Sequence, residues 1–226
     1  MNIAVIIPAF NEEKSIGKVI EAIPKNLVET IIVVNNNSTD DTVNIANLAG
    51  AIVLTENRKG YGWACLKGMD YLKDTSIDII VFLDGDFSDY PEEIAQLIRP
   101  ILEQNMDMVI GSRVLGKREK GSLLPQQRFG NWLATKLIRL FYGAKFTDLG
   151  PFRAIRYDKL MALNMADKTY GWTIEMQIKA AKKNYHFCEV PVSYRKRIGV
   201  SKVSGTIKGT LLAGIKIIFA VFKYRF

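Results

Sequence analysis

The chain has 226 residues, of which 48% are hydrophobic and 24% are charged, so it is long and apolar enough to fold into one globular domain. Its formal net charge of +8 favours anionic partners such as phosphorylated ligands, anionic lipids or nucleic acid. A nucleic-acid-binding protein usually concentrates its charge in basic runs, and none here is longer than Arg195-Lys196-Arg197, so we expect no nucleic acid among the partners. No apolar stretch reaches the ~18 residues that a bilayer span requires.

The two cysteines and the start of the chain bear on location. Cys65 and Cys188 lie far apart and lack the spacing of metal ligands, which predicts reduced thiols in a cytoplasmic protein. The chain runs from Met1 directly into an apolar segment without a basic leader or cleavage site, so we expect no signal peptide.

Strand and helix signals alternate through the first half of the chain. Apolar runs typical of buried strands are followed by apolar residues at helical spacing, and the runs cover residues 3–7, 31–34, 51–54, 78–84 and 108–110. This alternation predicts an α/β fold with a mostly parallel sheet and right-handed crossovers. Asp89 is expected to cap a helix that begins at Pro91.

Two carboxylates end the fourth predicted strand. Asp84 and Asp86, separated by Gly85, follow an apolar run and so lie at the carboxyl end of the strand, where ligands bind in open α/β sheets. Neighbouring carboxylates repel each other unless a cation lies between them, and Mg²⁺ or Mn²⁺ would suit oxygen ligands. Asp-Gly-Asp is also ordinary turn chemistry, so the motif alone supports a metal site and a turn about equally.

Other polar groups also follow predicted strands. Glu12 and Asn36 come after the first two, and Arg113 follows the strand over residues 108–110, where it could face phosphate or solvate a loop. The pattern is typical of nucleotide-binding α/β proteins. The sequence has no Gly-x-Gly-x-x-Gly fingerprint and no Walker lysine loop, which counts against dehydrogenases and P-loop enzymes.

Two segments have the apolar pattern of amphipathic helices. In residues 128–142 one predicted face is apolar (Phe129, Leu133, Leu137, Leu140, Phe141) and the other is polar (Arg128, Asn131, Thr135, Arg139). In residues 206–223 three lysines form a stripe on an apolar helix, which favours contact with an anionic membrane surface. For residues 128–142 the alternative to membrane contact is a surface helix packed on the core, and for residues 206–223 it is a buried core helix or an oligomer interface. We expect residues 1–205 to form the main unit and residues 206–226 to form a C-terminal amphipathic helix of the same domain.

Three further features of the second half could serve a site. Asp148 lies in a predicted turn, and Glu175 lies in the first turn of a predicted helix. The cationic segment from Arg195 to Lys202 contains a glycine, which suits a mobile loop that closes over a diphosphate. A solvated charge run is the alternative.

These pieces together resemble the family 2 glycosyltransferases of GT-A fold, and within them the dolichyl- and polyprenyl-phosphate sugar synthases. The resemblance spans residues 3–205 and depends on an ordered set of motifs rather than on any single one. The motifs are Pro8-Ala9-Phe10-Asn11-Glu12, Asn36 with Ser38-Thr39-Asp40, Gly60-Tyr61-Gly62, Asp84-Gly85-Asp86, Gly111-Ser112-Arg113, Asp148 with Gly150-Pro151-Phe152-Arg153, and Arg197 with Ser201-Lys202.

The resemblance implies a role for each matching position. Asp84 and Asp86 would hold Mg²⁺ or Mn²⁺, with Asp86 the more direct ligand. The residues implied in nucleotide-sugar binding are Pro8, Phe10, Glu12, Val34, Asn36, Asp84, Gly85, Arg113, Arg197 and Lys202. The implied reaction is transfer of a sugar, with inversion, from a nucleoside diphosphate sugar to a polyprenyl phosphate at the cytoplasmic face of a membrane. The divalent ion, together with Arg113, Arg197 and Lys202, would stabilise the leaving diphosphate.

The sequence departs from the family pattern at three places. Asn35-Asn36-Asn37-Ser38 replaces Asp-Asp-Gly-Ser, which leaves the base open between uracil and guanine. Ser88 stands where glutamine is common, and Gly150-Pro151-Phe152-Arg153 replaces Gly-Phe-Arg.

Two alternatives to the lipid-phosphate reaction remain open. In the first, the acceptor is a hydroxyl of a glycan or lipid, and Asp148 or Glu175 takes its proton as the catalytic base; the competing role of both carboxylates is to pair with nearby cations. In the second, the protein binds nucleotide or membrane without catalysis.

Overall fold

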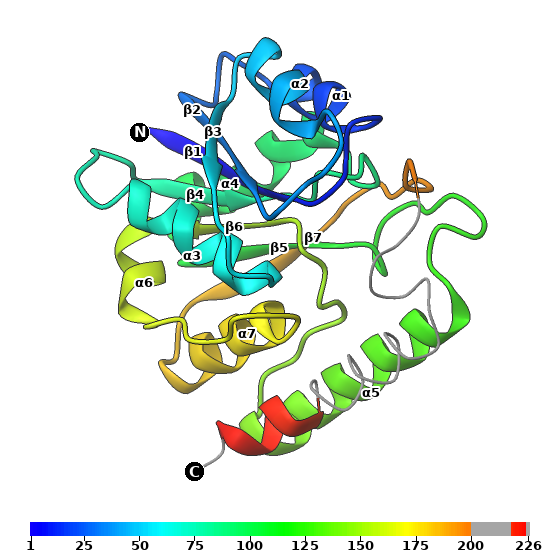
Figure 1. Ribbon diagram of the computed structural model, residues 1–226. Helices are drawn as coiled ribbons and strands as arrows, with labels where there is room; N and C mark the ends of the chain where they lie inside the picture. The colour runs from blue at the N-terminus through cyan, green and yellow to red at the C-terminus, as the bar shows by residue number, and fades with distance from the viewer. Residues whose placement is uncertain (200–217, 225–226) are drawn as a thin grey trace.

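The computed structural model describes residues 1–199 and 218–224 of the chain (Figure 1). Strands and helices alternate up to β5, as the apolar runs predict, and two further strands follow. The elements are β1 (Ile3–Ala9), α1 (Ile16–Ala22), β2 (Thr30–Asn35), α2 (Thr42–Leu48), β3 (Ile52–Thr55), α3 (Tyr61–Tyr71), β4 (Ile79–Phe82), the 3₁₀ turn η1 (Pro91–Glu93), α4 (Ile94–Glu103), β5 (Met108–Ser112), α5 (Pro125–Tyr142), β6 (Arg153–Arg156), α6 (Tyr157–Ala162), α7 (Trp172–Lys182) and β7 (Phe187–Pro191).

The strands form one sheet with the order β3-β2-β1-β4-β6-β5-β7. Only β6 runs antiparallel to its neighbours, so β4 and β5 point the same way on either side of it. The carboxyl ends of the six parallel strands therefore meet at one edge of the sheet, together with the amino end of β6. This arrangement confirms the expected mostly parallel sheet of the GT-A fold.

Helices cover both faces of the sheet because its central strands are apolar on both sides. Alternate residues of β1 divide between the two cores: Ile6 packs with α3, α5 and α7, whereas Val5 and Ile7 pack with α1, α2 and α4. In Figure 1, α1 and α2 lie on one side of the sheet, and α3, α6 and α7 lie on the other. A strand buried on both faces reads as a continuous apolar run, which is why periodicity alone identified β1 and β4.

Two details differ from the sequence expectations. Asp89 does not cap a helix, since Tyr90 precedes η1 and no side chain caps it. In α5 the buried face contains Ala134, Thr135 and Ile138, so Thr135 is wrongly placed on the polar face by the sequence pattern. Helix α5 exposes aromatic side chains instead, because its polar Asn131 bonds inward to the main chain near residue 147.

The C-terminal prediction is tested only in part. Residues 218–223 are helical, and the ring of Phe222 lies 5.3 Å from that of Phe141 on α5. Lys202 and most of the predicted helix over residues 206–223 lie outside the described residues, as does the boundary at residue 205. In the part of the chain that the structure describes, no helix combines the length and hydropathy of a membrane span.

Candidate active site

The polar groups that the sequence singles out gather at the carboxyl edge of the sheet. Glu12 follows β1, Asp84 and Asp86 follow β4, and Arg113 follows β5. The segment after β7 carries Arg197 to the same edge, because β7 is parallel to β5. In Figure 1 this segment, in orange, approaches the sheet edge beside the loop that follows β5.

Asp86 is the most fully engaged of these groups. Its side chain is buried, and its Oδ1 accepts hydrogen bonds from the main-chain N–H and the hydroxyl of Ser88 at 2.9 and 2.5 Å. Its Oδ2 lies 2.5 Å from Nη2 of Arg197. The same guanidinium nitrogen is 3.9 Å from Oε1 of Glu12. The edge thus holds two carboxylates around one arginine.

Asp84 lies beside this pair. The hydroxyl of Tyr61, the first residue of α3, donates to its Oδ1 at 3.1 Å. Burial, and secondarily the charge of Asp86, raise the pKa of Asp84 above its ordinary value, and the positive charges of Arg197 and Arg113 oppose this shift. A carboxylate whose ionisation is opposed by burial and by a neighbouring carboxylate is a place that a cation would stabilise.

Arg113 is held by Asp148. Asp148 is fully buried, and its carboxylate accepts from the main-chain N–H, Nε and Nη2 of Arg113 at 2.8, 2.8 and 2.7 Å. Glu189 of β7 fixes Asp148 in turn, since its carboxylate accepts the main-chain N–H groups of Thr147 and Asp148. Arg153 on β6, whose side chain is also buried, donates to the carbonyls of the same loop. Asp148 therefore forms a bidentate ion pair.

Glu175 belongs to a different cluster. Its buried carboxylate accepts the main-chain N–H groups of Ala166 and Asp167 and the hydroxyl of Tyr224, and it pairs with Lys179 at 2.7 Å. Both candidate bases thus have the cation-pairing role that competes with catalysis. General-base catalysis by either stays a prediction.

The predicted base-binding residues lie at the ends of β1 and β2. Phe10 is exposed just after β1, whereas the side chain of Val34 is fully buried in the core, so only its main chain can meet a ligand. The side chain of Asn36 holds the next loop: its amide donates to the carbonyls of Glu56 and Arg58, and its oxygen accepts the N–H of Gly60. Asn36 thus shapes the loop that leads into α3. Pro8 pairs with Val34 in the ladder between β1 and β2.

The sequence reasoning missed Asp89 at this site, and it named Arg195 only as part of a cationic segment. Asp89 is buried, and neither oxygen of its carboxylate has a hydrogen-bond partner among the described residues. Burial, with the charge of Asp84, raises its pKa well above the ordinary value. Arg195 donates to the carbonyls of Phe87 and Asp89, so it holds the loop that carries Asp86. The capping pattern before Pro91 concealed Asp89, whereas the basic run did signal Arg195.

Carboxylates outnumber arginines at this edge among the described residues. Five carboxylates belong to it (Glu12, Asp84, Asp86, Asp89, Asp148), against four arginines (Arg113, Arg153, Arg195, Arg197). Among the same residues no group of three or more side chains forms a ready-made metal cage. A donor set of one or two carboxylates fits Mg²⁺, which keeps water ligands and takes others from substrate phosphates.

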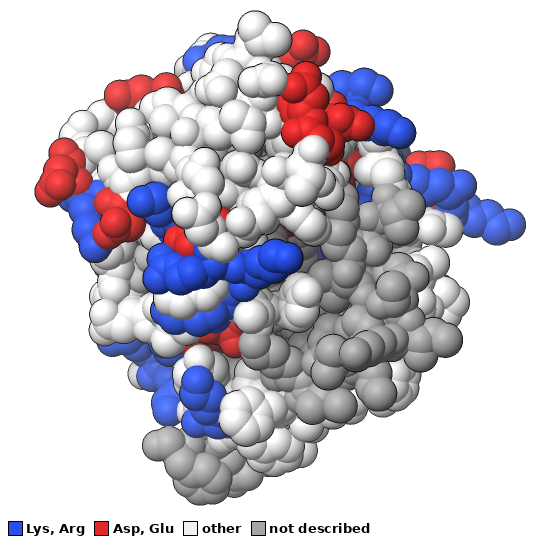
Figure 2. Space-filling view, in the orientation of Figure 1, with Lys and Arg blue, Asp and Glu red and all other residues white. Residues whose placement is uncertain are grey.

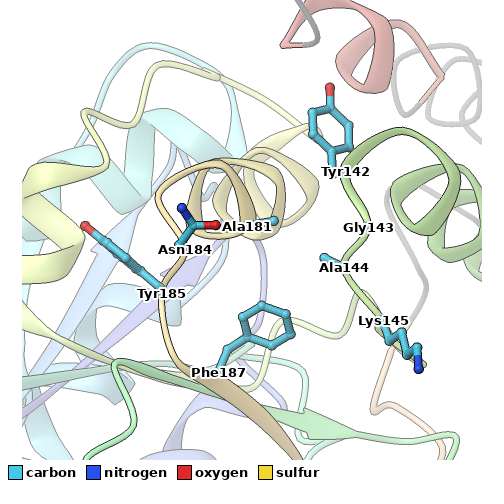
Figure 3. Close-up of a pocket in the computed structure, with 8 residues that line it drawn as sticks. All are labelled: Tyr142, Gly143, Ala144, Lys145, Ala181, Asn184, Tyr185 and Phe187. Carbon is cyan, nitrogen blue, oxygen red and sulfur yellow. The ribbon is translucent and has the colours of Figure 1, made fainter.

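The structure shows two further surface features. A cavity of about 470 Å³ is lined by the end of α5 with the turn after it (Tyr142 to Lys145) and by residues around the end of α7, and none of the predicted site residues lines it (Figure 3). Figure 2 shows Lys and Arg side chains gathered over the start of α3, where Arg58 and Lys168 both lie over the ring of Trp63.

The sequence matches known proteins. The family model of glycosyl transferase family 2 matches residues 4–163. An uncharacterized glycosyltransferase of Mycobacterium tuberculosis is 34% identical over 215 residues, which cover 93% of this chain and 94% of the relative. The undecaprenyl-phosphate mannosyltransferase of Micrococcus luteus is 27% identical over an alignment that covers 95% of this chain and 93% of the relative.

A solved structure shares the fold. Glucosyl-3-phosphoglycerate synthase from Mycobacterium tuberculosis aligns with a TM-score of 0.79 at 23% identity, over 99% of this chain and 79% of its own. The family match covers well over half of this sequence, and it includes the Asp84-Gly85-Asp86 motif and Arg113. The chain therefore belongs to glycosyl transferase family 2 and is a glycosyltransferase.

Proposed function

We propose that this glycosyltransferase moves a sugar, with inversion, from a nucleoside diphosphate sugar to a polyprenyl phosphate at the cytoplasmic face of a membrane. The observation that carries the proposal is the excess of carboxylates around Asp84 and Asp86, at the sheet edge that also holds Arg113 and Arg197. An excess of negative charge binds a divalent cation, and the arginines bind the diphosphate that the cation bridges.

The relatives support both substrates. One is named an undecaprenyl-phosphate mannosyltransferase, and another, from Methanococcus voltae, is named a UDP-N-acetylglucosamine–dolichyl-phosphate N-acetylglucosaminyltransferase, at 28% identity. Glucosyl-3-phosphoglycerate synthase has been solved with UDP-glucose and Mn²⁺, and also with UDP and Mg²⁺. A nucleotide-sugar donor, a divalent ion and a lipid-phosphate acceptor follow from these names by analogy.

Asp84 and Asp86 are the residues that would hold the ion. When bound, the ion supplies positive charge that stabilises the leaving diphosphate. Arg113 contributes a guanidinium that Asp148 and Glu189 hold in a fixed orientation, so no reorganisation is needed as charge develops on the leaving group. Arg197 and Lys202 are expected to contribute further positive charge.

The base and ribose would be held beyond the diphosphate. Phe10 presents an exposed ring after β1, and the loop shaped by Asn36 borders the same end of the sheet. We assign nucleotide contacts to Pro8, Phe10 and Glu12, and a main-chain contact to Val34.

The two candidate bases, Asp148 and Glu175, are each paired with a cation, which favours a lipid phosphate as the acceptor. A phosphate oxygen is already anionic at neutral pH, so its attack on the sugar needs no base. Asp148 is bound bidentately by Arg113, and Glu175 is bound by two main-chain N–H groups and a lysine, so neither carboxylate is free to take a proton.

The membrane part of the proposal rests on adjacent apolar helices. On α5 the side chains of Phe129, Trp132 and Leu140 are 62%, 54% and 73% exposed. The segment 218–223 also exposes Phe219 and lies against α5, where the hydroxyl of Tyr142 donates to the carbonyl of Val221. Exposed aromatic side chains beside lysine and arginine suit an anionic lipid interface.

Transfer to a hydroxyl acceptor is the second candidate, and Asp89 favours it. A hydroxyl must lose a proton as it attacks, and Asp89 is a buried carboxylate without a hydrogen-bond partner among the described residues, close enough to feel the charges of Asp84 and Asp86. Under this alternative Asp89, rather than Asp148 or Glu175, takes the proton.

A product assay separates the two candidates. The purified protein is incubated in detergent with Mn²⁺, a panel of UDP- and GDP-sugars, and one acceptor at a time: undecaprenyl phosphate, dolichyl phosphate, a hydroxyl lipid or a glycan. The products are identified by mass spectrometry. We expect one donor to give a lipid monophosphate sugar, and we expect Asp86→Ala to abolish the product while the fold is retained. Transfer to hydroxyl lipids or glycans but not to lipid phosphates would reject the first candidate.

A further inference from the structure

The segment after β7 is joined by main-chain hydrogen bonds to the loop of residues 86–89. The main-chain N–H of Arg195 donates to the carbonyl of Ser88 at 2.9 Å, and that of Ile198 donates to the carbonyl of Asp86 at 2.9 Å. Tyr194 forms an isolated β-bridge with Asp89. We call residues 194–198 the strap. The main chain of the strap therefore pairs with the loop of residues 86–89 in the manner of a short β-ladder.

Within the strap, Arg195 is fixed. Its Nε and Nη2 donate to the carbonyls of Phe87 and Asp89 at 2.7 and 3.1 Å. Its guanidinium also lies 3.4 Å from the ring centre of Phe87 and 4.0 Å from that of Tyr90. Hydrogen bonds and two ring faces together hold this side chain to the loop.

Arg197 is held far less completely. Only Nη2 pairs with Asp86, at 2.5 Å, while Nε is buried and has no hydrogen-bond partner among the described residues. An arginine fork normally meets a carboxylate with two parallel bonds, as Arg113 does with Asp148. Among the described residues Arg197 therefore pairs with carboxylates through one nitrogen only, closely with Asp86 and at 3.9 Å with Glu12, and it keeps donors for another anion.

Asp86 is the carboxylate that the proposed divalent ion needs. Its Oδ1 is taken by Ser88, so Oδ2 is the oxygen that Arg197 and an incoming cation must share. Two cations cannot both lie within bonding distance of one carboxylate oxygen without strong mutual repulsion. Binding of the ion must displace the guanidinium.

We propose that Arg197 is an exchangeable internal cation. It pairs with Asp86 before the ion binds, and it transfers to the nucleotide diphosphate when the ion takes Asp86, while Arg195 keeps the strap in place. This inference rests on the proposed function and adds to it a coupling between the two ligands. An ion bound to Asp86 releases Arg197 for the diphosphate, and a bound diphosphate draws Arg197 away from Asp86 and so frees this carboxylate for the ion. Each ligand therefore favours the binding of the other.

The inference predicts opposite effects on two ligands. Arg197→Ala removes a competitor of the metal, so Mn²⁺ should bind about fivefold or more tightly in the absence of nucleotide, which corresponds to about 1 kcal/mol for the loss of a largely buried competing ion pair. The same variant loses a charge-assisted contact to the diphosphate, so UDP or GDP, whichever the unmodified protein binds, should bind about tenfold or more weakly at saturating Mn²⁺. A merely structural role for Arg197 would weaken both ligands.

Titration calorimetry and the electron paramagnetic resonance signal of free Mn²⁺ measure the two affinities. Lys196→Ala is the matched control, because it removes the same charge from the neighbouring position, where the side chain is 60% exposed and pairs with Glu119; its Mn²⁺ affinity should stay within about twofold of the original. Arg197→Gln is the second variant, in case the alanine variant does not fold.

Each outcome has a distinct meaning. Tighter Mn²⁺ and weaker nucleotide binding in both Arg197 variants support the exchange. Unchanged or weaker Mn²⁺ binding in these variants overturns it, even if Mn²⁺ still depends on Asp86. If the unmodified protein and Asp86→Ala bind Mn²⁺ equally, the metal assignment of the proposed function fails, and the exchange fails with it.

Discussion

The ion pair between Asp148 and Arg113 gives the most quantitative prediction. Asp148→Asn preserves the size of the side chain and removes its charge. The side chain of Asp148 is fully buried and that of Arg113 is 13% exposed, so the substitution leaves a guanidinium in a dry environment without its counter-charge. Breaking such a buried pair costs about 3–5 kcal/mol, and we expect about 3 kcal/mol because Arg113 retains some contact with solvent.

Urea unfolding followed by circular dichroism measures this loss. The double variant Asp148→Asn/Arg113→Met should recover part of it, with a coupling free energy of about 2 kcal/mol, because it removes the uncompensated charge. Glu103→Gln is the control, since Glu103 pairs with Arg99 at the surface and its loss should cost less than about 0.5 kcal/mol. A loss below about 1 kcal/mol for Asp148→Asn would refute the assignment of a tight buried pair.

The same variant distinguishes two roles for Asp148. If Asp148 positions Arg113 for the diphosphate, Asp148→Asn weakens nucleotide binding. A catalytic base would instead lower kcat and leave nucleotide affinity unchanged.

The remaining predictions concern stability and membrane contact. Gly62→Ala should destabilise the protein by about 2 kcal/mol or more, because the added Cβ would lie 2.1 Å from a main-chain carbonyl oxygen of the loop before α7. Gly130→Ala is the control, since its added Cβ would meet no atom within 4 Å and should not destabilise the protein. Urea unfolding compares the two variants. A hydrogen bond from Arg58 lowers the pKa of Glu56 to about 2, so the stability that the Glu56 carboxylate contributes is present above about pH 5 and is lost as the pH falls toward 2. The loss of stability caused by Glu56→Gln should therefore shrink over that range when unfolding is measured as a function of pH. A loss that persists at pH 2 would contradict this. The double variant Phe129→Ser/Trp132→Ser should lose most binding to phosphatidylglycerol vesicles in a flotation assay, and unchanged flotation would refute membrane contact through α5.

Much of the fold could be predicted because its central strands are buried on both faces. A run such as Ile79 to Leu83 has no other reading than a strand or buried core, and its two acids then must lie at the carboxyl edge. Parallel pairing brings the ends of β1, β4 and β5 together, so the convergence of Glu12, Asp86 and Arg113 followed from topology alone.

Other parts depend on contacts that the sequence does not encode locally. Thr135 reads as polar, yet it lies on the buried face of α5, because the helix is anchored through Asn131 to a loop distant in sequence. The partners of Asp148 are Arg113, 35 residues away, and Glu189 on β7, and no periodicity predicts either pairing. The carboxylate of Asp89, which has no hydrogen-bond partner in the part of the chain that the structure describes, was concealed because an acid before Pro91 has the pattern of a helix cap.

Diffraction from a crystal soaked with Mn²⁺ and the nucleotide that binds most tightly tests the central claim most directly, since anomalous scattering locates the ion. The account predicts an anomalous peak roughly 2.1 Å from an oxygen of Asp86 and from oxygens of the diphosphate, with Arg197 turned from Asp86 to the diphosphate. A peak elsewhere, with Arg197 still paired to Asp86 and the diphosphate away from both, would contradict the account.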